Sequence, residues 1–230
     1  MWRIDFHVHS CYSKDSAMSH EEIIKCCKDR GLNCIALTDH NELDGALEME
    51  KSGLFRVIAG EEIKTADGEI IGLFLKEKIR GGLTPEETVR EIKAQGGLVY
   101  IPHPFSKWRR TKLKFSAIEK IKHDIDIMEV FNGRNFFRTD NLKAEEYALK
   151  NNITVAVGSD SHITCELGSC YVEVEDFSSP SELLTVLKHG HRVTNLSSAF
   201  VHFGSACVRI RKNLSKILSK NRVLYKNDKV

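Results

Sequence analysis

Two histidines near the N-terminus have the spacing of a metal-binding pair. His7 and His9 stand at the end of an apolar run, residues 2–8, whose composition predicts a β-strand. Alternate residues of a strand point to the same face, so the two imidazoles can converge on one ion. Two histidines at this spacing also occur by chance on strand surfaces, so the pair alone leaves both interpretations open.

Further imidazoles and carboxylates occupy equivalent places in the chain. Five of the ten histidines lie at or just beyond the ends of predicted strands: His7, His9, His40, His103 and His162. The acidic residues that lie there or in the adjoining loops are Asp15, Asp39, Glu62 and Asp160. This mixture of ligands suits zinc, manganese or iron better than magnesium or calcium. It exceeds what one ion needs, so the pattern predicts two or three divalent ions that share a bridging carboxylate.

Such a group of ions indicates phosphoryl chemistry. Adjacent divalent ions hold both the attacking and the leaving oxygen of a phosphoryl displacement, and they lower the pKa of a bound water. No serine or cysteine nucleophile is then needed. We therefore expect Ser10, Cys11 and Ser13 to be loop residues or to support the ligands.

Short apolar runs alternate with amphipathic segments along the chain. The predicted strands are residues 2–8, 34–38, 55–63, 70–75, 98–101, 125–131, 154–157, 171–174 and 191–194. The predicted helices are residues 19–30, 43–51, 84–94, 116–122, 135–150 and 181–188. Ser19 with Glu22, and Thr84 with Glu87, have the spacing of capping boxes that begin two of these helices.

This alternation predicts an α/β fold in which crossover helices connect parallel strands. Six or seven such units favour a barrel over a small open sheet, and in barrels of this class the chemistry lies at the carboxyl ends of the strands. We find no repeat or linker inside the barrel. The predicted organisation is therefore one barrel domain over residues 1–204, followed by a basic C-terminal helix and tail over residues 205–230.

The composition is that of a soluble globular protein. Hydrophobic residues make up 41% and charged residues 29% of the 230 positions, and no apolar run approaches the ~18 residues of a membrane span. The N-terminus lacks the basic and apolar regions of a secretory signal, and the seven cysteines have neither disulfide nor zinc-ribbon spacing. We expect a cytoplasmic protein with free thiols and no membrane contact.

Charge is unevenly distributed along the chain. The net charge is +2, but residues 209–229 hold eight lysines and arginines and one acidic residue. Two interpretations stay open for this basic tail. It is either a solvated terminal helix or a contact with a polyanionic substrate or partner, such as a short nucleic acid.

Five short motifs occur in a fixed order over residues 1 to about 165. They are His7-Val8-His9-Ser10 with Ser13-Lys14-Asp15, Thr38-Asp39-His40-Asn41, Gly60-Glu61-Glu62-Ile63, Pro102-His103-Pro104-Phe105 and Gly158-Ser159-Asp160-Ser161-His162. In this combination they resemble the polymerase-and-histidinol-phosphatase (PHP) superfamily of metal-dependent phosphoesterases. The resemblance implies a distorted seven-stranded (β/α) barrel with a C-terminal helical extension.

The resemblance also implies a ligand set for each ion. The first ion would be held by His7, His9, Glu62 and Asp160, the second by Glu62 and His103, and the third by Asp15, His40 and His162. The family usually adds a histidine to the second site, at a position where this chain has Glu69. Glu69 is then either a ligand or a solvent-facing turn residue, and the protein binds two or three ions.

Substrate contacts follow from a resemblance to the small, single-domain branch of the family. Residues 129–134 resemble a Glu-Val-x-Asn pattern of that branch, which implies that Asn132 and Arg134 face the site. Arg134 is the expected substrate clamp, because a guanidinium matches phosphate with two parallel hydrogen bonds. The alternative is that Arg134 caps a carbonyl group or pairs with Asp140.

The expected activity is hydrolysis of a phosphate ester by metal-activated water. Asp39 is expected to orient its neighbour His40. Arg109 and Trp108 lie in a basic loop after His103 that fits nucleotide binding, or else is an ordinary solvated loop. The resemblance favours a small phosphorylated metabolite or nucleotide, such as a nucleoside 3′,5′-bisphosphate or an oligonucleotide end, with histidinol phosphate as the alternative substrate. The other alternative is a non-catalytic module that binds metal or nucleic acid, which the missing second-site histidine supports.

Overall fold

The computed structural model describes residues 1–197, 201, 206–212 and 214. The strands are β1 (Trp2–Val8), β2 (Cys34–His40), β3 (Arg56–Thr65), β4 (Gly68–Leu73), β5 (Leu98–Ile101), β6 (Ile127–Asn132), β7 (Thr154–Gly158), β8 (Cys170–Val174) and β9 (His191–Thr194). The helices are α1 (His20–Asp29), α2 (Asp44–Ser52), α3 (Pro85–Ala94), α4 (Phe115–Ile121), α5 (Arg138–Lys150) and α6 (Pro180–Leu187). Every predicted strand and helix is present, with ends shifted by at most three residues.

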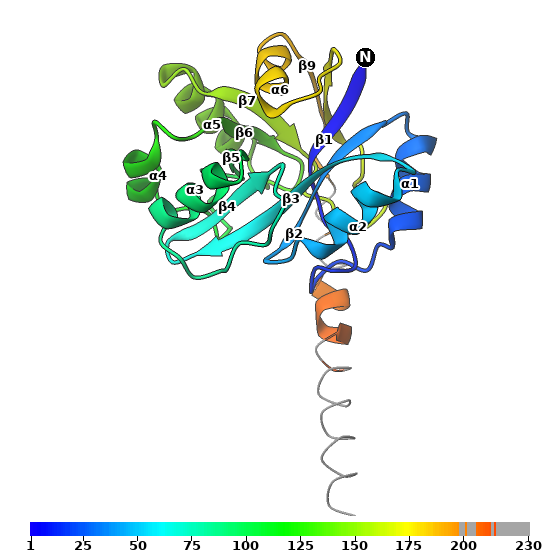
Figure 1. Cartoon of the computed structure of the whole chain (residues 1–230). Helices are drawn as coiled ribbons and strands as arrows, with labels where there is room; N and C mark the ends of the chain where they lie inside the picture. Colours follow the sequence, from blue (N-terminus) through cyan, green and yellow to red (C-terminus); the bar gives the residue numbers. More distant parts are fainter. Residues whose placement is uncertain (198–200, 202–205, 213, 215–230) are drawn as a thin grey trace, which may run out of the picture.

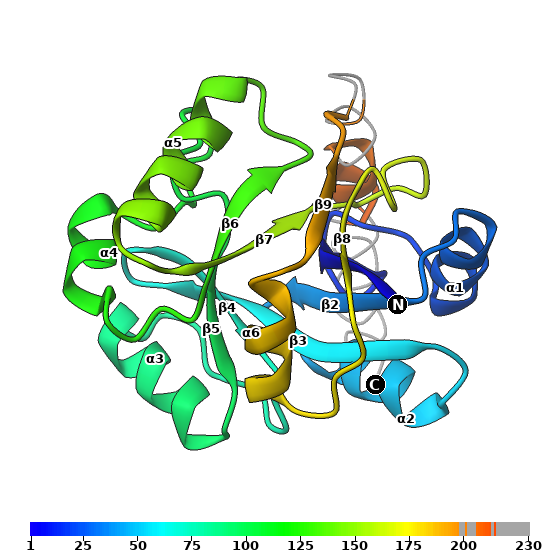
Figure 2. The same ribbon diagram turned by 90° about the horizontal axis from the view of Figure 1, so that it is seen from above.

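Strands β1 to β7 follow one another around a barrel, with helices on the outside (Figure 1 and Figure 2). The strand order in the sheet is β7-β6-β5-β4-β3-β2-β1-β8-β9. Strand β1 also meets the chain just after β7, where the Ser161 N–H donates to the carbonyl of His7 (3.3 Å) and the His9 N–H donates to the carbonyl of Ser161 (3.0 Å). The seven strands thus form a nearly closed barrel, which confirms the predicted fold class, and β8 and β9 extend the sheet beyond β1.

The predicted parallel sheet with crossover helices holds for only half of the strand pairs. Pairs β3–β4, β4–β5, β1–β8 and β8–β9 are antiparallel, whereas β1–β2, β2–β3, β5–β6 and β6–β7 are parallel. The reversal begins between β3 and β4, which only residues 66 and 67 separate. A parallel connection needs a dozen or more residues, so the chain turns back in a hairpin. Within the described barrel, β4 alone runs against the other six strands.

Closure of the barrel depends on a close approach between β7 and β1. A Cβ atom at Gly158 would lie 2.4 Å from the Cβ of His7 and 2.6 Å from Oε1 of Glu129. No side chain fits in that space, so a glycine is required at the end of β7. Because Gly158 has no side chain, β7 can pass directly behind His7, the first predicted ligand.

Both predicted capping boxes are confirmed. At the start of α1, the Ser19 N–H donates to the Glu22 carboxylate (2.8 Å) and the Glu22 N–H donates to the Ser19 hydroxyl (3.2 Å). Thr84 and Glu87 make the same pair of hydrogen bonds at the start of α3, at 2.9 and 3.2 Å. These bonds satisfy backbone donors that the first turn leaves unpaired, so each helix begins where the sequence predicts.

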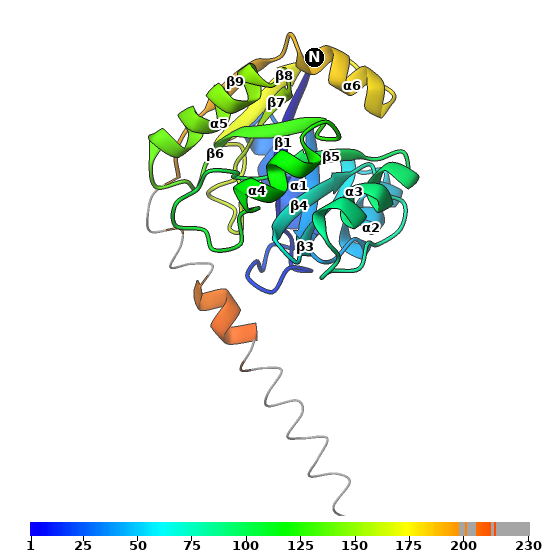
Figure 3. The same ribbon diagram turned by 90° about the vertical axis from the view of Figure 1, so that its left-hand side faces the viewer.

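The predicted C-terminal helix is present over its described part. Residues 206–212 are helical and lie beside the loop after β1 (orange in Figure 1 and Figure 3). The Lys212 ammonium donates to the carbonyls of Cys11 (2.6 Å) and Ser13 (2.7 Å) in that loop. The rest of the basic tail, residues 215–230, lies outside the described residues, and the domain boundary at residue 204 stays a prediction.

Two expectations about thiols and membranes can be compared with the structure. All seven cysteines are free thiols, as predicted. Among the residues that the structure describes, no helix has the length and apolar character needed to cross a bilayer.

Candidate metal centre

The nine predicted metal ligands meet at one rim of the barrel. They are His7 on β1, His9 just after it, Asp15 in the following loop, His40 on β2, Glu62 on β3, Glu69 on β4, His103 after β5, and Asp160 and His162 after β7. We call these nine residues the ligand cluster. Because β4 is reversed, its amino end lies at the same rim as the carboxyl ends of the other barrel strands. This reversal brings Glu69 into the cluster.

Glu62 lies at the centre of the cluster. Its Oε2 atom is 3.5 Å from Nε2 of His7, 3.5 Å from Nε2 of His9 and 2.8 Å from Nδ1 of His40. Its Oε1 atom is 3.1 Å from Nε2 of His103. A single buried carboxylate within reach of four imidazoles has the arrangement of a bridging ligand.

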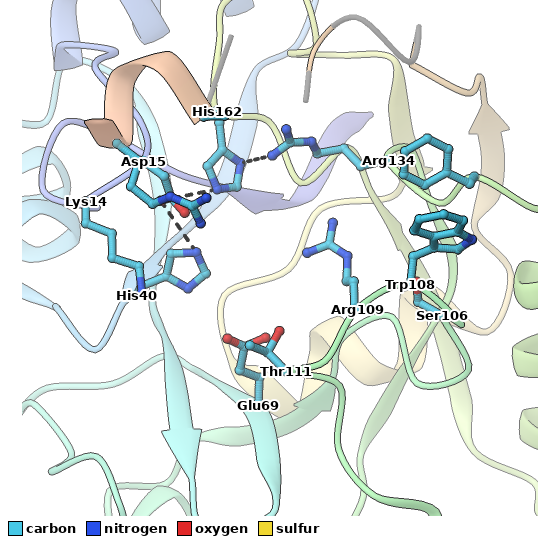
Figure 4. Close-up of a pocket in the computed structure, with 13 residues that line it drawn as sticks. Lys14, Asp15, His40, Glu69, Ser106, Trp108, Arg109, Thr111, Arg134 and His162 are labelled. Carbon is cyan, nitrogen blue, oxygen red and sulfur yellow. Dashed lines mark hydrogen bonds and ion pairs between the residues drawn. The ribbon is translucent and has the colours of Figure 1, made fainter. Parts of the chain in front are cut away.

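Asp15 lies between two imidazoles on the solvent side of the cluster. Its Oδ1 atom is 3.6 Å from Nε2 of His40 and 3.5 Å from Nε2 of His162. Figure 4 shows these three side chains directed toward one another at the mouth of the cavity. They come from three separate segments of the chain and offer one oxygen and two nitrogen atoms to a common point.

Asp160 contacts both histidines of the N-terminal pair. Its Oδ1 atom is 3.7 Å from Nε2 of His7 and 3.4 Å from Nε2 of His9. Its Oδ2 atom accepts hydrogen bonds from the Arg109 guanidinium and from the Asn132 amide (3.1 Å). Two residues predicted to bind substrate are therefore joined here to a predicted metal ligand.

The structure resolves the two alternatives for the side chain of Glu69. This side chain is buried, and the residue is only 5% exposed, so it is not a solvent-facing turn glutamate. Its Oε2 atom lies 3.8 Å from Nε2 of His103, and Figure 4 shows its carboxylate directed into the cavity. A carboxylate thus stands close to the place where the family usually has a histidine.

Several buried polar atoms of the cluster have no hydrogen-bond partner among the described residues. They are Nε2 of His7, Nε2 of His9, Nδ1 of His103, Oδ1 of Asp15, Oδ1 of Asp160 and Oε2 of Glu69. A buried polar atom without a partner costs about 1–3 kcal/mol, so their concentration in one place requires an explanation. Within the cluster, sets of three side chains bring ligand atoms within 4.8 Å of one another. This combination of nitrogen and oxygen donors fits a group of divalent cations.

Hydrogen bonds behind the cluster hold His7 in the form that can bind a metal ion. Nδ1 of His7 lies 3.0 Å from Oε1 of Glu129 and donates to it, which leaves the lone pair of Nε2 facing the cluster. The same carboxylate accepts from the Tyr100 hydroxyl (2.9 Å) and from the backbone N–H of His103 (2.6 Å). Glu129 lies in the motif of residues 129–134, but the motif alone does not predict this role for it.

His9 is held in a corresponding way through Ser13. The Ser13 hydroxyl donates to Asp39 (2.5 Å), so it can only accept from Nδ1 of His9 (3.2 Å) and from the backbone N–H of His40 (3.1 Å). The expectation that Asp39 orients the imidazole of His40 is therefore corrected. Asp39 acts through Ser13, and this series of hydrogen bonds orients the imidazole of His9.

The electrostatic surroundings shift the pKa values of the ligand cluster in both directions. Although burial acts to lower them, nearby carboxylates raise the pKa of His7 well above its usual value and the pKa of His40 to about 9. Burial lowers the pKa of His9 well below its usual value and also lowers the pKa of His103, so both imidazoles are neutral. Burial acts in the opposite direction on Glu62 and Asp160, but nearby imidazoles and a guanidinium hold the pKa of both carboxyls well below the usual range. Burial beside Glu62 raises the pKa of Glu69 to about 7. Neutral imidazoles and ionised carboxylates are the forms that coordinate metal ions.

Two predicted ligands have an unusual backbone conformation. His103 has a φ of 33° and Asp160 a φ of 56°, in the left-handed region that non-glycine residues avoid. Such residues cost about 1–3 kcal/mol each and concentrate at functional sites. Here the conformation directs both side chains toward Glu62 and the N-terminal histidines.

Arg134, the predicted substrate clamp, is buried in the cavity wall. Its Nε atom lies 3.1 Å from Oε1 of Glu166, and its Nη1 atom lies 2.7 Å from Nδ1 of His162. Asp140, the partner considered from the sequence, instead accepts a hydrogen bond from the backbone N–H of Lys107 (2.9 Å). Glu166 could not be predicted from the sequence, because a single glutamate in a loop carries no motif that could identify it.

The cluster opens into a cavity of about 400 Å³, a size typical of small-molecule sites. Trp108 and Phe136 line one wall, are 69% and 50% exposed, and have ring centroids 5.6 Å apart. Four basic residues also line the cavity: Lys14, Arg109, Arg134 and Arg209. An aromatic surface and several cations therefore surround the opening to the cluster (Figure 4).

Comparison with known sequences identifies relatives along most of the chain. A family model described as PHP-associated matches residues 138–191. The uncharacterized protein MJ0417 of Methanocaldococcus jannaschii is 38% identical in an alignment of 197 residues, and the match covers 81% of this chain and 79% of that protein.

Comparison with solved structures shows the same fold in proteins of low sequence identity. A two-domain protein from Bacteroides vulgatus that contains a predicted PHP-like metal-dependent phosphoesterase matches with a TM-score of 0.64 and 20% identity, over 84% of this chain and 65% of that one. Endonuclease Q, in complex with a 27-mer duplex substrate that has an abasic lesion, matches with a TM-score of 0.58 and 19% identity, over 84% of this chain and 58% of that one. The chain thus spans about two thirds or less of both proteins.

Proposed function

The chain belongs to the PHP superfamily of metal-dependent phosphoesterases, and we propose that it hydrolyses a phosphate ester of a nucleotide or another small metabolite. The observation that carries this proposal is the position of Glu62 among four imidazoles, with unpaired buried donor and acceptor atoms around it. A structural role alone would not explain so many unpaired polar atoms at one rim of a barrel.

The proposed ligands divide around Glu62. The side chains of His7, His9 and Asp160 would hold one ion, and those of His103 and Glu69 would hold a second. Glu62 would be a ligand of both. A further ion would be held by three side chains at the mouth of the cavity: Asp15, His40 and His162. When bound, such ions polarise phosphoryl oxygens and lower the pKa of water.

The protein supplies the orientation of these ligands and of the ester. Glu129 and Ser13 hold the imidazoles of His7 and His9 with their Nε2 lone pairs toward the cluster. Arg109 pairs with Asp160 in this structure. Cations bound to Asp160 would compete for that carboxylate and leave the guanidinium available to a phosphate group, which it can bind through two parallel hydrogen bonds.

The cavity favours a substrate with a planar ring. Trp108 and Phe136 present exposed aromatic faces at its wall, and base–aromatic stacking contributes about 1–3 kcal/mol per base. A nucleotide therefore fits this wall better than an unsubstituted sugar phosphate does. The shared fold with endonuclease Q, whose structure holds a nucleic acid substrate, is consistent with this choice. The buried carboxylate of Glu69 lies 3.8 Å from Nε2 of His103 and can serve in place of the missing second-site histidine, so we favour the enzyme over a non-catalytic module.

Phosphate release from a panel of nucleotides and other monoesters, with manganese or zinc added to metal-stripped protein, tests the proposal. We expect metal-dependent release that His9→Ala lowers by at least about 100-fold, because outer-sphere changes alone cost 10- to 100-fold. His123→Ala is the matched control, since His123 is exposed and lies outside the cluster. Release that needs no metal, or that survives His9→Ala, would contradict the proposal.

A further inference from the structure

A second cavity, separate from the metal centre, lies between α5 and β9. Its volume is about 580 Å³, within the range of small-molecule sites. Side chains of β6, β7, α5, β9 and the chain just after β9 line it. None of them belongs to the ligand cluster or lines the cavity of the metal centre. We call it the α5 cavity.

The buried part of the wall of the α5 cavity is apolar. Val130 and Val157 are 3% and 0% exposed, and Phe131 and Leu196 are half-buried. A hydrocarbon group placed against these side chains removes apolar surface from water, which is favourable. This wall therefore fits a ligand with a hydrocarbon body.

One buried polar group lies in this wall. The Oδ1 atom of Asn141 accepts hydrogen bonds from the backbone N–H of Asn132 (3.2 Å) and from the Asn135 amide (2.6 Å). A backbone N–H can only donate, so the first bond fixes which end of the Asn141 amide is the oxygen. Its Nδ2 atom is buried and has no hydrogen-bond partner among the described residues. A buried donor without a partner is costly, so this NH2 group fits a ligand that offers an acceptor.

The charged side chains of the α5 cavity leave one cation unpaired. Nη2 of Arg192 lies 2.8 Å from Oε1 of Glu145. Within the part of the chain that the structure describes, the Arg138 guanidinium makes no hydrogen bond or ion pair. Two guanidinium groups and one carboxylate line the cavity, so their net charge is +1. That charge matches a single carboxylate better than a phosphate group, which carries about −1.5 to −2.

We infer that the α5 cavity is a second binding site, which takes a small carboxylate with a hydrocarbon body. Arg138 and Asn141 are three residues apart on α5 and share one face of the helix, so both can donate to the same carboxylate. The hydrocarbon body packs against Val130 and Val157. The inference is independent of the proposed function, because the two cavities share no residue. Carboxylic acids and apolar amino acids both offer this chemistry.

An NMR titration of ¹⁵N-labelled protein with phenylacetate tests the inference. EDTA is present, because metal ions would themselves bind a carboxylate. We expect a Kd of about 1 mM, typical of so small a ligand, and shifts at the backbone amides of Val157 and Leu196. Arg138→Ala should raise the Kd about tenfold, the size of one charge-assisted hydrogen bond. Arg90→Ala is the matched control and should leave the Kd unchanged, because Arg90 is exposed on α3 and does not line the cavity.

The donor of Asn141 has a test of its own. In Asn141→Asp the side chain can still accept from Asn132 and Asn135, but it cannot donate and it repels a carboxylate. Phenylacetate should then bind more than about tenfold more weakly than to the wild type. Phenylacetamide, which has no charge, should bind the wild type about tenfold more weakly than phenylacetate does.

Titration with L-phenylalanine distinguishes the two sources of the carboxylate. A lower Kd for L-phenylalanine than for phenylacetate assigns the site to amino acids, with Glu145 as the acceptor for the ammonium group. A lower Kd for phenylacetate assigns it to carboxylic acids.

Three results would overturn the inference. The first is no binding of phenylacetate at about ten times the expected Kd. The second is a set of shifts at the metal centre, around Ser106 and Thr111, in place of shifts at Val157 and Leu196. The third is an equal Kd in Arg138→Ala and Arg90→Ala.

Discussion

The carboxylate of Glu129 offers the sharpest test of how the ligands are oriented. Its two oxygens accept four hydrogen bonds: Oε1 from Nδ1 of His7 (3.0 Å) and the Tyr100 hydroxyl (2.9 Å), and Oε2 from the backbone N–H of His103 (2.6 Å) and the Asn132 amide (2.9 Å). In Glu129→Gln one of these oxygens becomes an NH2 group, which cannot accept. The substitution preserves shape and removes both the charge and half of the acceptor capacity.

Both orientations of the new amide have a cost. If its NH2 faces His103, a buried backbone N–H loses its acceptor, at about 1–3 kcal/mol of unfolding free energy. If its NH2 faces His7, Nδ1 must become the acceptor, and the ring proton moves to Nε2. An Nε2–H cannot bind a metal ion, so the second orientation sacrifices metal affinity instead.

We expect Glu129→Gln to weaken manganese binding by about 10- to 100-fold. Binding to the folded state adds RT ln(1 + [metal]/Kd) to the unfolding free energy, so the increase that manganese produces should shrink by about 1.4–2.8 kcal/mol. Urea unfolding with saturating manganese and with EDTA measures this increase. In EDTA, where no metal is bound, any loss of unfolding free energy in Glu129→Gln comes from the lost hydrogen bonds of Glu129 alone.

Glu119→Gln is the matched control for this experiment. Glu119 also accepts a hydrogen bond from a tyrosine hydroxyl, that of Tyr147 (2.5 Å), but it is exposed and remote from the cluster. Glu119→Gln should change the unfolding free energy by less than about 0.5 kcal/mol. The increase in unfolding free energy that manganese produces should be the same in this variant as in the wild type. If Glu129→Gln showed the same response as Glu119→Gln, the proposed orientation of His7 would be refuted.

Three further predictions concern single side chains. Ser13→Ala removes the hydroxyl that joins Asp39 to His9, and calorimetric titration should show manganese binding about tenfold weaker; unchanged binding would contradict this route. Glu69→Gln should lower the metal content found by elemental analysis by one ion per chain, and wild-type content would exclude Glu69 as a ligand. Burial raises the pKa of Glu61 from the usual 4.5 to about 7, so its carboxyl binds a proton more tightly in the folded state than in the unfolded state. The stability that this protonation supplies is full below pH 4.5 and is lost as the pH rises through 7. As the pH rises from 5 to 8 in EDTA, the unfolding free energy of Glu61→Gln should therefore increase by about 3 kcal/mol relative to that of the wild type. Parallel pH profiles of the two proteins in urea unfolding would disprove the assignment.

Local sequence patterns were sufficient to predict the elements and to predict that the candidate ligands come together. Apolar runs and capping residues act over a few neighbours, so they predicted all the strands and helices and both capping boxes. The placement of His7, His40 and His103 at strand ends predicted that they would meet, because a barrel brings the carboxyl ends of its strands to one rim. This prediction needs only the order of the strands.

Other features depend on contacts between segments far apart in the chain. The reversal of β4, which a two-residue connection imposes, carries Glu69 into the cluster rather than into solvent. The pairing of Arg134 with Glu166 and the link from Asp39 through Ser13 were decided by which partner each buried group could reach. Periodicity and capping contain no information about such partners, because the contacts form only after the chain has closed the barrel.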